Sequence, residues 1–430
     1  MNRNTLWGTF AVILLLGLAG LVSQEEASSI SALQQLSTAP KSTAPKLIAS
    51  RPEAHISQLV DASNRFGFDL FNQLQLQQKS QSQNILISPQ SMAIALAMTR
   101  NGTAGATQAE MTQVLELGQL DPTTVDLSYD QLIKTLTNND PSVELAIANS
   151  LWVNQNISLK ASFIQTTQDF YQGKVSNLNF ADPTAKQIIN QWVASNTAHK
   201  IPEMLEAIAP DDALYLLNAI YFKGSWTNKF EPNATIAKPF YLQPKTTKPV
   251  AMMSQTGDYR YYQNQDFQAI RLPYGKQGEL GMYIFLPQKN SNLEQFQQQL
   301  NLANWQEWLS QMRSQPGNVS LPKFKLEYET ELKDVLASLG MGQVFDATKA
   351  DFSAMTDNTV ALNTVKHKAV IEVNEEGTEA AGATSFGIQI TSATPQNQAF
   401  EMNINRPFFF AIRDDITETV LFMGNVVEPK

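Results

Sequence analysis

The hydrophobic pattern of the chain changes from a helical period near the start to a strand period near the end. From Gln58 onward, apolar residues recur mostly at intervals of three and four, which is typical of an amphipathic helix. The same period predicts helices at 91–98, 107–115, 162–171, 185–195 and 331–339. Short apolar or alternating runs predict strands at 84–88, 143–153, 214–222, 268–272, 280–287, 319–326 and 369–373. Helices early and strands predominantly late indicate an α+β domain with large mixed sheets.

The stretch from Val373 to about Phe400 fits neither a core element nor a short turn. It lies between an apolar run that ends at Val373 and another at 407–412, and it holds roughly thirty residues. Connections longer than about 12–15 residues in compact domains are usually functional or disordered. This stretch is therefore the first candidate for function.

Alternate residues of this stretch divide into two sets from Thr378 onward. One set is Thr378, Ala380, Gly382, Thr384, Phe386 and Ile388, and the other is Glu379, Ala381, Ala383, Ser385, Gly387 and Gln389. A period of two is that of a strand, so the first set can be buried while the second faces water. The Ala and Gly residues give the segment little strand propensity of its own, but they would let it slide between two existing strands. From these residues alone, an insertable strand and a flexible Ala/Gly-rich loop both remain open.

Composition excludes several classes of function. The formal net charge of −9 disfavours a nucleic-acid or polyanion binder. The chain has no cysteine, which excludes thiol catalysis, disulfides and cysteine-ligated metals. Its histidines, His55, His199 and His367, are far apart in the sequence, so we expect no metal site and no cofactor. The sequence contains no nucleophile-elbow, zinc-protease or phosphate-loop motif, so we expect no enzyme activity.

The amino-terminal residues predict an export signal followed by a spacer. Residues 1–23 contain Arg3 and an apolar run from Phe10 to Val22, about thirteen residues, which is short for a bilayer span. A signal peptide is therefore preferred, with an uncleaved amino-terminal anchor as the alternative. Residues 24–57 are polar and rich in Ala, Ser, Pro and Gln, which predicts a disordered spacer. We expect an exported protein that is secreted, periplasmic or attached to the envelope.

Five short strings, in order along the chain, carry a resemblance to one family. They are Ser88-Pro89-Gln90-Ser91, NAIYFKGSW at 218–226, EEGTEAAGAT at 375–384, NRPF at 405–408 and LFMG at 421–424. The chain resembles the serpins, a family of serine protease inhibitors, and among them the inhibitory, exported bacterial members. The resemblance covers about Gln58 to Lys430, which implies a single domain at 58–430 with a serpin-like fold and an exposed reactive-centre loop. One departure is His199, where the family usually has Gly, and it concerns the geometry of one turn.

The resemblance assigns roles to residues in three places. The shutter, a polar cluster beneath the middle strands of the central sheet, is implied to comprise Ser88, Ser91, Asn218 and His367. The breach, where the loop first enters that sheet, is implied to comprise Trp226, Lys323 and Glu375. The hinge that inserts is implied to comprise Glu375, Gly377, Thr378, Glu379, Ala380, Ala381, Gly382, Ala383 and Thr384. A lone histidine is usually an ordinary core residue, but His367 precedes the hinge on the same predicted strand, which favours the switch role.

The resemblance further implies suicide inhibition of serine proteases through a covalent acyl complex. Counting from the hinge glutamate places the bait bond at Thr391 and Ser392, with Ile390 and Ala393 as alternative positions. No Lys or Arg occurs from 375 to 404, so an elastase-like or subtilisin-like protease is expected and a trypsin-like one is not. The alternative function is that of a non-inhibitory, serpin-fold binding or structural protein. We expect a monomer without nucleic-acid or small-molecule cofactor partners, and membrane contact only through an uncleaved amino-terminal segment.

Overall fold

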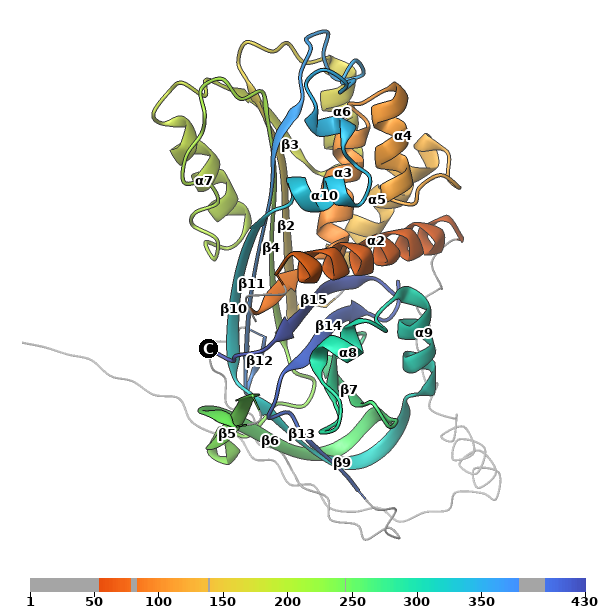
Figure 1. Cartoon of the computed structure of the whole chain (residues 1–430), viewed down its shortest axis with the longest axis vertical. Coiled ribbons are helices and arrows are strands. Elements are labelled where there is room, and N and C mark those ends of the chain that lie inside the picture. The colour runs from red at the N-terminus through yellow and green to blue at the C-terminus, as the bar shows by residue number, and fades with distance from the viewer. Residues whose placement is uncertain (1–53, 79–82, 138–139, 244, 379–398) are drawn as a thin grey trace, which may run out of the picture. The chain divides into compact units, whose positions relative to one another are not determined.

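The computed structural model describes residues 54–78, 83–137, 140–243, 245–378 and 399–430 (Figure 1). The predicted signal or anchor at 1–23 and the spacer up to residue 53 lie outside these ranges. So does the segment 379–398, which holds Glu379, Ala380, Ala381, Gly382, Ala383 and Thr384 of the predicted hinge and the predicted bait residues Thr391 and Ser392. The described part of the hinge is therefore Glu375, Gly377 and Thr378.

Six of the described helices lie where the periodicity of the sequence predicts them, with one corrected boundary, and those at 122–137, 293–297 and 302–311 were not predicted. They are α2 (Ala54–Gln78), α3 (Pro89–Arg100), α4 (Gly105–Val114), α5 (Pro122–Thr137), α6 (Ala161–Tyr171), α7 (Ala185–Asn196), α8 (Leu293–Gln297), α9 (Leu302–Gln311) and α10 (Lys333–Ser338). The prediction that the spacer extends to residue 57 is wrong, because α2 begins at Ala54 and Ile56 is buried on the same helix face as Leu59 and Val60. Within the described ranges, no helix has both the length and the apolar character of a membrane span.

A six-stranded sheet carries Gly377 and Thr378 of the predicted hinge. Its strands follow the order β10 (Phe324–Glu331), β11 (Leu362–Asn374), β12 (Gly377–Thr378), β4 (Leu214–Ser225), β2 (Val143–Asn154) and β3 (Lys174–Leu178). Figure 1 shows α7 on one face of this sheet and the group of helices that includes α3 and α6 on the other. Because both faces are covered, the middle strand β4 is buried almost throughout, as the apolar run at 214–222 predicted.

A second sheet of nine strands packs against the first. Its path is β1 (Ile85–Ile87), β15 (Val420–Val426), β14 (Phe408–Asp414), β8 (Leu280–Pro287), β7 (Phe267–Tyr274), β6 (Thr246–Gln263), β9 (Arg313–Pro322) and β13 (Phe400–Asn403), and β5 (Ile236–Gln243) pairs with β6. The single strand predicted at 319–326 is wrong, since β9 ends at Pro322 and β10 begins at Phe324 in the other sheet. The alternation of apolar and polar residues changes phase at this junction, from Val319 and Leu321 on β9 to Phe324 and Leu326 on β10, so the sequence does mark the change of partner.

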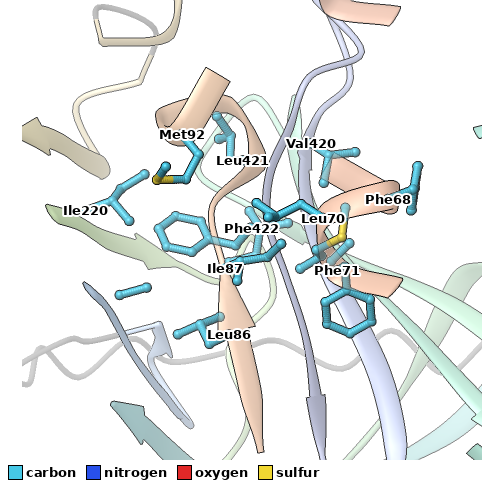
Figure 2. Packing of buried hydrophobic residues seen from close by; sticks show 14 of the residues in the cluster. Phe68, Leu70, Phe71, Leu86, Ile87, Met92, Ile220, Val420, Leu421 and Phe422 are labelled. Carbon is cyan, nitrogen blue, oxygen red and sulfur yellow. The ribbon is translucent and has the colours of Figure 1, made fainter. Parts of the chain in front are cut away.

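The main hydrophobic core joins the two sheets beneath α2. Figure 2 shows side chains from α2 (Phe68, Leu70, Phe71), β1 (Leu86, Ile87), α3 (Met92), β4 (Ile220) and β15 (Val420, Leu421, Phe422) in this core. All are almost fully buried, and each contributes roughly 1.5–3 kcal/mol by leaving water. This packing fixes β4 against the helices behind it, so that β4 forms a rigid side of the site described next.

The turn at His199 keeps the geometry that a glycine would allow. Ala198 has φ of +48° and His199 has φ of +59°, both in the left-handed region. His199 is exposed, so its side chain meets no packing constraint there. The departure from the family's glycine is thus accommodated locally.

Candidate functional site

The candidate site is a gap between β11 and β4 at one end of the six-stranded sheet. From the Leu362–Leu214 pair to the Val370–Tyr221 pair, these strands run parallel and are directly bonded. Beyond that point β12 lies between them, antiparallel to both. Two residues of the predicted hinge thus already form a short strand inside the sheet, and the rest of the β11–β4 seam is closed.

Gly377 occupies a position that only glycine fits. Its φ is +150°, and a Cβ placed on it would lie 2.0 Å from the carbonyl oxygen of Gly224 and 2.7 Å from Cα of Ser225. Backbone atoms cannot move aside to make room for a methyl group, whereas the end of a flexible side chain can. The glycine therefore permits the close approach of β12 to β4.

The Gly377→Ala variant is expected to expel β12 from the sheet. The free energy of unfolding of the uncut protein should fall by about 1–3 kcal/mol, because the new methyl group meets backbone and the φ is strained. Hydrogen exchange with mass spectrometry should show that protection of the amides of 374–378 is lost. Gly118→Ala is the matched control, since a Cβ at Gly118 would meet nothing within 4 Å. Retained protection in Gly377→Ala would contradict this account of the gap.

Thr378 is the first hinge side chain to be fully buried. It is 0% exposed, and its hydroxyl lies 2.6 Å from the hydroxyl of Tyr274. Burial raises the pKa of Tyr274 well above its ordinary value, so the phenol stays neutral and the two hydroxyls share one hydrogen bond. The alternation of the sequence predicted that this residue faces inward, and the prediction is confirmed at this position.

Trp226 holds the turn that leads into β12. Its ring stacks on the ring of Tyr274, with centroids 4.3 Å apart and planes 12° apart. Its indole nitrogen donates to the carbonyl of Asn374 at 2.9 Å, and its backbone N–H donates to the carbonyl of Glu376 at 2.9 Å. The predicted breach residue therefore contacts the hinge directly.

Two ion pairs close the turn on its other side. In the first pair, Lys323 Nζ lies 2.9 Å from one carboxylate oxygen of Glu375. The other oxygen of Glu375 accepts a hydrogen bond from the Thr235 hydroxyl at 2.8 Å. The second pair joins Lys229 to Glu376. Burial alone would raise the pKa of Glu375, but hydrogen bonds and the lysine charge lower it below its ordinary value. Since the Lys323 side chain is 40% exposed, this pair is worth about 1 kcal/mol or less. An interaction of this size can only make a small adjustment to the position of the turn.

The four predicted shutter residues meet beneath the closed part of the seam. His367 on β11 lies opposite Asn218 on β4, and Asn218 in turn lies opposite Asn149 on β2. The Nδ1 of His367 lies 2.6 Å from Oδ1 of Asn218, and its Nε2 accepts from the backbone N–H of Ser88 at 3.2 Å. Asn218 also donates to the hydroxyl of Ser91 and to Oδ1 of Asn149. The sequence analysis missed Asn149, because its only signal is a polar residue inside an apolar strand.

The hydrogen bonds of His367 require a neutral imidazole. Nε2 accepts, so the proton sits on Nδ1 and donates to Asn218. The side chain is fully buried, and this burial lowers its pKa to about 3. Both strands of the closed β11–β4 seam thus contribute a polar side chain to one buried cluster, in which hydrogen-bond partners can be exchanged.

The buried imidazole gives the uncut protein a defined pH dependence. The unfolded chain binds the proton near pH 6.5 and the folded one only near 3, so stability is lost as pH falls between these values. At pH 5 the loss relative to pH 7.5 is about 2 kcal/mol. His367→Gln, whose amide can replace both hydrogen bonds, should lack this loss when urea midpoints are compared at the two pH values. His55→Gln, at an exposed position, should keep it. Equal pH dependence in all three proteins would contradict the assignment.

Comparison with known proteins identifies what the chain is similar to. A family model described as "Serpin (serine protease inhibitor)" matches residues 61–429. The human leukocyte elastase inhibitor is 35% identical, over 87% of this chain and 100% of that protein. A serpin-like protein of Thermococcus kodakarensis is 34% identical, over 88% of this chain and 87% of that protein.

Two solved structures share the fold along nearly the whole described chain. The thermophilic serpin tengpin in its native state has a TM-score of 0.79 and 29% identity, and the match covers 88% of this chain and 96% of that one. Human thyroxine-binding globulin complexed with thyroxine has a TM-score of 0.80 and 25% identity, and the match covers 88% of this chain and 100% of that one.

Proposed function

The chain belongs to the serpin family, and from this premise we propose that it is a suicide-substrate inhibitor of serine proteases. The observation that carries the proposal is the two-residue strand β12 between β11 and β4. It occupies the first positions of a strand that the following residues, 379 onward, can complete. Serpins are generally inhibitors and not catalysts, which agrees with the expectation that the chain is not an enzyme.

The proposed mechanism begins as ordinary proteolysis. The protease serine attacks the carbonyl carbon of Thr391, the amine of Ser392 leaves, and an ester joins Thr391 to the enzyme. The severed loop then extends β12, replaces the parallel β11–β4 pairing and carries the protease along. About fifteen residues at 3.3 Å each give roughly 50 Å of travel. Distortion of the protease site by even about 1 Å slows its chemistry, so hydrolysis of the ester stalls.

Small uncharged residues at the proposed bait bond favour an elastase-like or subtilisin-like target. No basic residue occurs from 375 to 404, which disfavours trypsin-like enzymes. One relative of this chain is named as an inhibitor of leukocyte elastase, which agrees with this preference. Mass spectrometry of the released fragment tests the assignment, and a cut outside 389–394 would overturn it.

The alternative is a non-inhibitory binding or structural protein of the same fold. It is supported by one structural neighbour, a thyroxine-binding globulin complexed with thyroxine. Against it stands the hinge, where Gly377 and Thr378 fit the sheet and the residues to Thr384 are small except for Glu379. Bulky, charged or proline residues there would obstruct insertion. The hinge therefore favours an inhibitor.

A panel of serine proteases run on a denaturing gel tests the proposal. The expected result is a band at the summed mass of inhibitor and protease, which survives denaturation because the bond is an ester. Protease with its catalytic serine blocked is the control, and it should give no such band. Cleavage of the loop by every protease without any covalent band would reject inhibition and favour the alternative.

We further propose that the protein acts outside the cytoplasm. The support is the apolar run from Phe10 to Val22 behind Arg3, followed by a polar spacer. Cell fractionation combined with amino-terminal sequencing tests export and cleavage together. Retention of residues 1–23 in the membrane fraction would select the anchor over the signal peptide.

A further inference from the structure

A polar cavity of about 440 Å³ lies beside β13, near the start of β7 and the end of β8. The strands β7, β13 and β14 are labelled in Figure 1, and the cavity also touches the link between β13 and β14. Its volume falls within the range of pockets that hold small ligands. None of its described lining residues belongs to the hinge, breach or shutter, so the cavity is separate from the site discussed above.

Charged side chains that a ligand can reach line this cavity. Lys289 and Arg406 are positive and Glu401 is negative, so the described part of the wall carries one net positive charge. Lys289 and Glu401 are exposed and Arg406 is partly exposed, so each of them is open to a molecule in the cavity. Within the described ranges, none of the three forms an ion pair with another side chain. The cavity therefore presents charges of both signs that a ligand can neutralise.

The guanidinium of Arg406 is held in a fixed orientation. Its Nε donates to the carbonyl of Pro287 at 2.8 Å, and its Nη1 donates to Oδ1 of Asn405 at 3.3 Å. A guanidinium has five N–H groups, so the other three have no acceptor among the described residues. Burial lowers the pKa of Arg406 below its ordinary value, and no carboxylate offsets this effect. A partly buried cation with free donors in a fixed fork is suited to bind a carboxylate.

The rest of the described wall consists of amide side chains. Gln268 donates through Nε2 to the carbonyl of Glu401 at 2.9 Å, which holds β13 beside β7 and pre-forms the cavity. The amides of Asn290 and Asn403 are exposed and bond to no other residue of the described ranges, so they remain available to a ligand. A wall of amides and charges favours a ligand that is polar over most of its surface.

We propose that this cavity binds a free acidic amino acid, which carries two carboxylates and one ammonium group. The carboxylates pair with Arg406 and Lys289, and the ammonium pairs with Glu401. The single net negative charge of such a ligand is opposite to that of the described wall. A simple dianion such as phosphate would bring its second charge close to Glu401 and would leave that carboxylate without a partner. The site is independent of the proposed inhibitory function.

Titration of the full chain with L-glutamate at constant ionic strength tests the proposal. Saturation-transfer NMR should give a dissociation constant on the order of 1 mM, as expected for a ligand of this size. L-glutamine, which has the same shape but lacks one carboxylate, should bind about three- to tenfold more weakly. The Arg406→Gln variant should bind L-glutamate at least about tenfold more weakly, because a charge-assisted pair is lost. Lys276→Gln, at an exposed position in the turn before β8, is the matched control and should bind normally.

The role of Glu401 has its own test. Glu401→Gln should weaken binding of L-glutamate but not of glutarate, which has both carboxylates and no ammonium group, and equal loss for both ligands would reject this pairing.

Three outcomes would overturn the proposal as a whole. They are no binding of L-glutamate at about ten times the expected dissociation constant, equal affinity for L-glutamate and L-glutamine, and unchanged affinity in Arg406→Gln. If Arg406→Gln does not fold, Lys289→Gln replaces it, since Lys289 is exposed and its substitution leaves the core intact. Lys289→Gln should weaken binding by about threefold, as expected for an exposed ion pair, and unchanged affinity would reject the site.

Discussion

Under the proposed mechanism, Thr378→Arg is expected to turn an inhibitor into a substrate. Thr378 is fully buried against Tyr274 in the gap between β11 and β4, so an arginine there must stay outside the sheet or bury an unpaired charge. That burial costs several kcal/mol, and each 1.4 kcal/mol slows a step about tenfold. Insertion competes with hydrolysis of the ester, so the yield of covalent complex should fall at least about tenfold while the loop is still cut at a normal rate. A denaturing gel of a timed reaction measures both quantities.

Glu379→Arg is the matched control for this prediction. The alternation that placed Thr378 inward places Glu379 on the outward side, where a new positive charge remains in water. This variant should keep most of its covalent yield. If Thr378→Arg forms complex as efficiently as Glu379→Arg, insertion led by Thr378 is wrong, whatever the fate of the loop.

The sequence predicted those features of the site that depend on local patterns. The apolar run at 214–222 became a strand covered on both faces, and the alternation from Thr378 placed that side chain inside the sheet. The resemblance of short strings to the family identified Asn218, Ser88 and Ser91, and the overall resemblance identified His367 on the strand before the hinge; the structure brings all four into one cluster. Except for His367, the signal lies within a few consecutive residues.

Features that depend on partners far apart in the sequence could not be predicted. Asn149, Tyr274 and Lys229 contact the shutter or hinge only because β2, β7 and the segment after β4 lie beside them in space. Nothing in the residues around Tyr274 or Lys229 distinguishes them from ordinary strand or loop residues, and Asn149 is marked only as a polar residue among apolar ones. The extent of the gap is also a tertiary property, since it is set by the point at which β11 and β4 separate. By contrast, α5 was missed although Val125, Tyr129, Leu132 and Leu136 repeat at helical spacing.

Cleavage of the reactive-centre loop is expected to raise the melting temperature by more than about 10 °C. Over the Leu362–Val370 stretch, β11 is bonded directly to β4 in parallel, and an inserted strand would replace that seam with antiparallel pairing on both of its sides. Insertion would also bury Phe386 and Ile388, which contribute roughly 1.5–3 kcal/mol each. At about 1–2 °C per kcal/mol for a chain of this size, these two side chains account for roughly 3–12 °C, and the new antiparallel pairing adds to that shift. Scanning calorimetry of intact and cut protein measures the shift.

The Thr378→Arg variant separates the effect of insertion from that of the cut itself. Both proteins carry the same severed bond after cleavage, but only the natural sequence can place its loop between β11 and β4. The cut variant should therefore melt close to its intact form, while the cut natural protein should melt well above it. If both cut proteins are stabilised equally, the stabilisation does not come from an inserted strand, because a buried arginine at position 378 would oppose it. If neither is stabilised, the closed seam between β11 and β4 is already the most stable arrangement of the sheet, and suicide inhibition by insertion has no driving force.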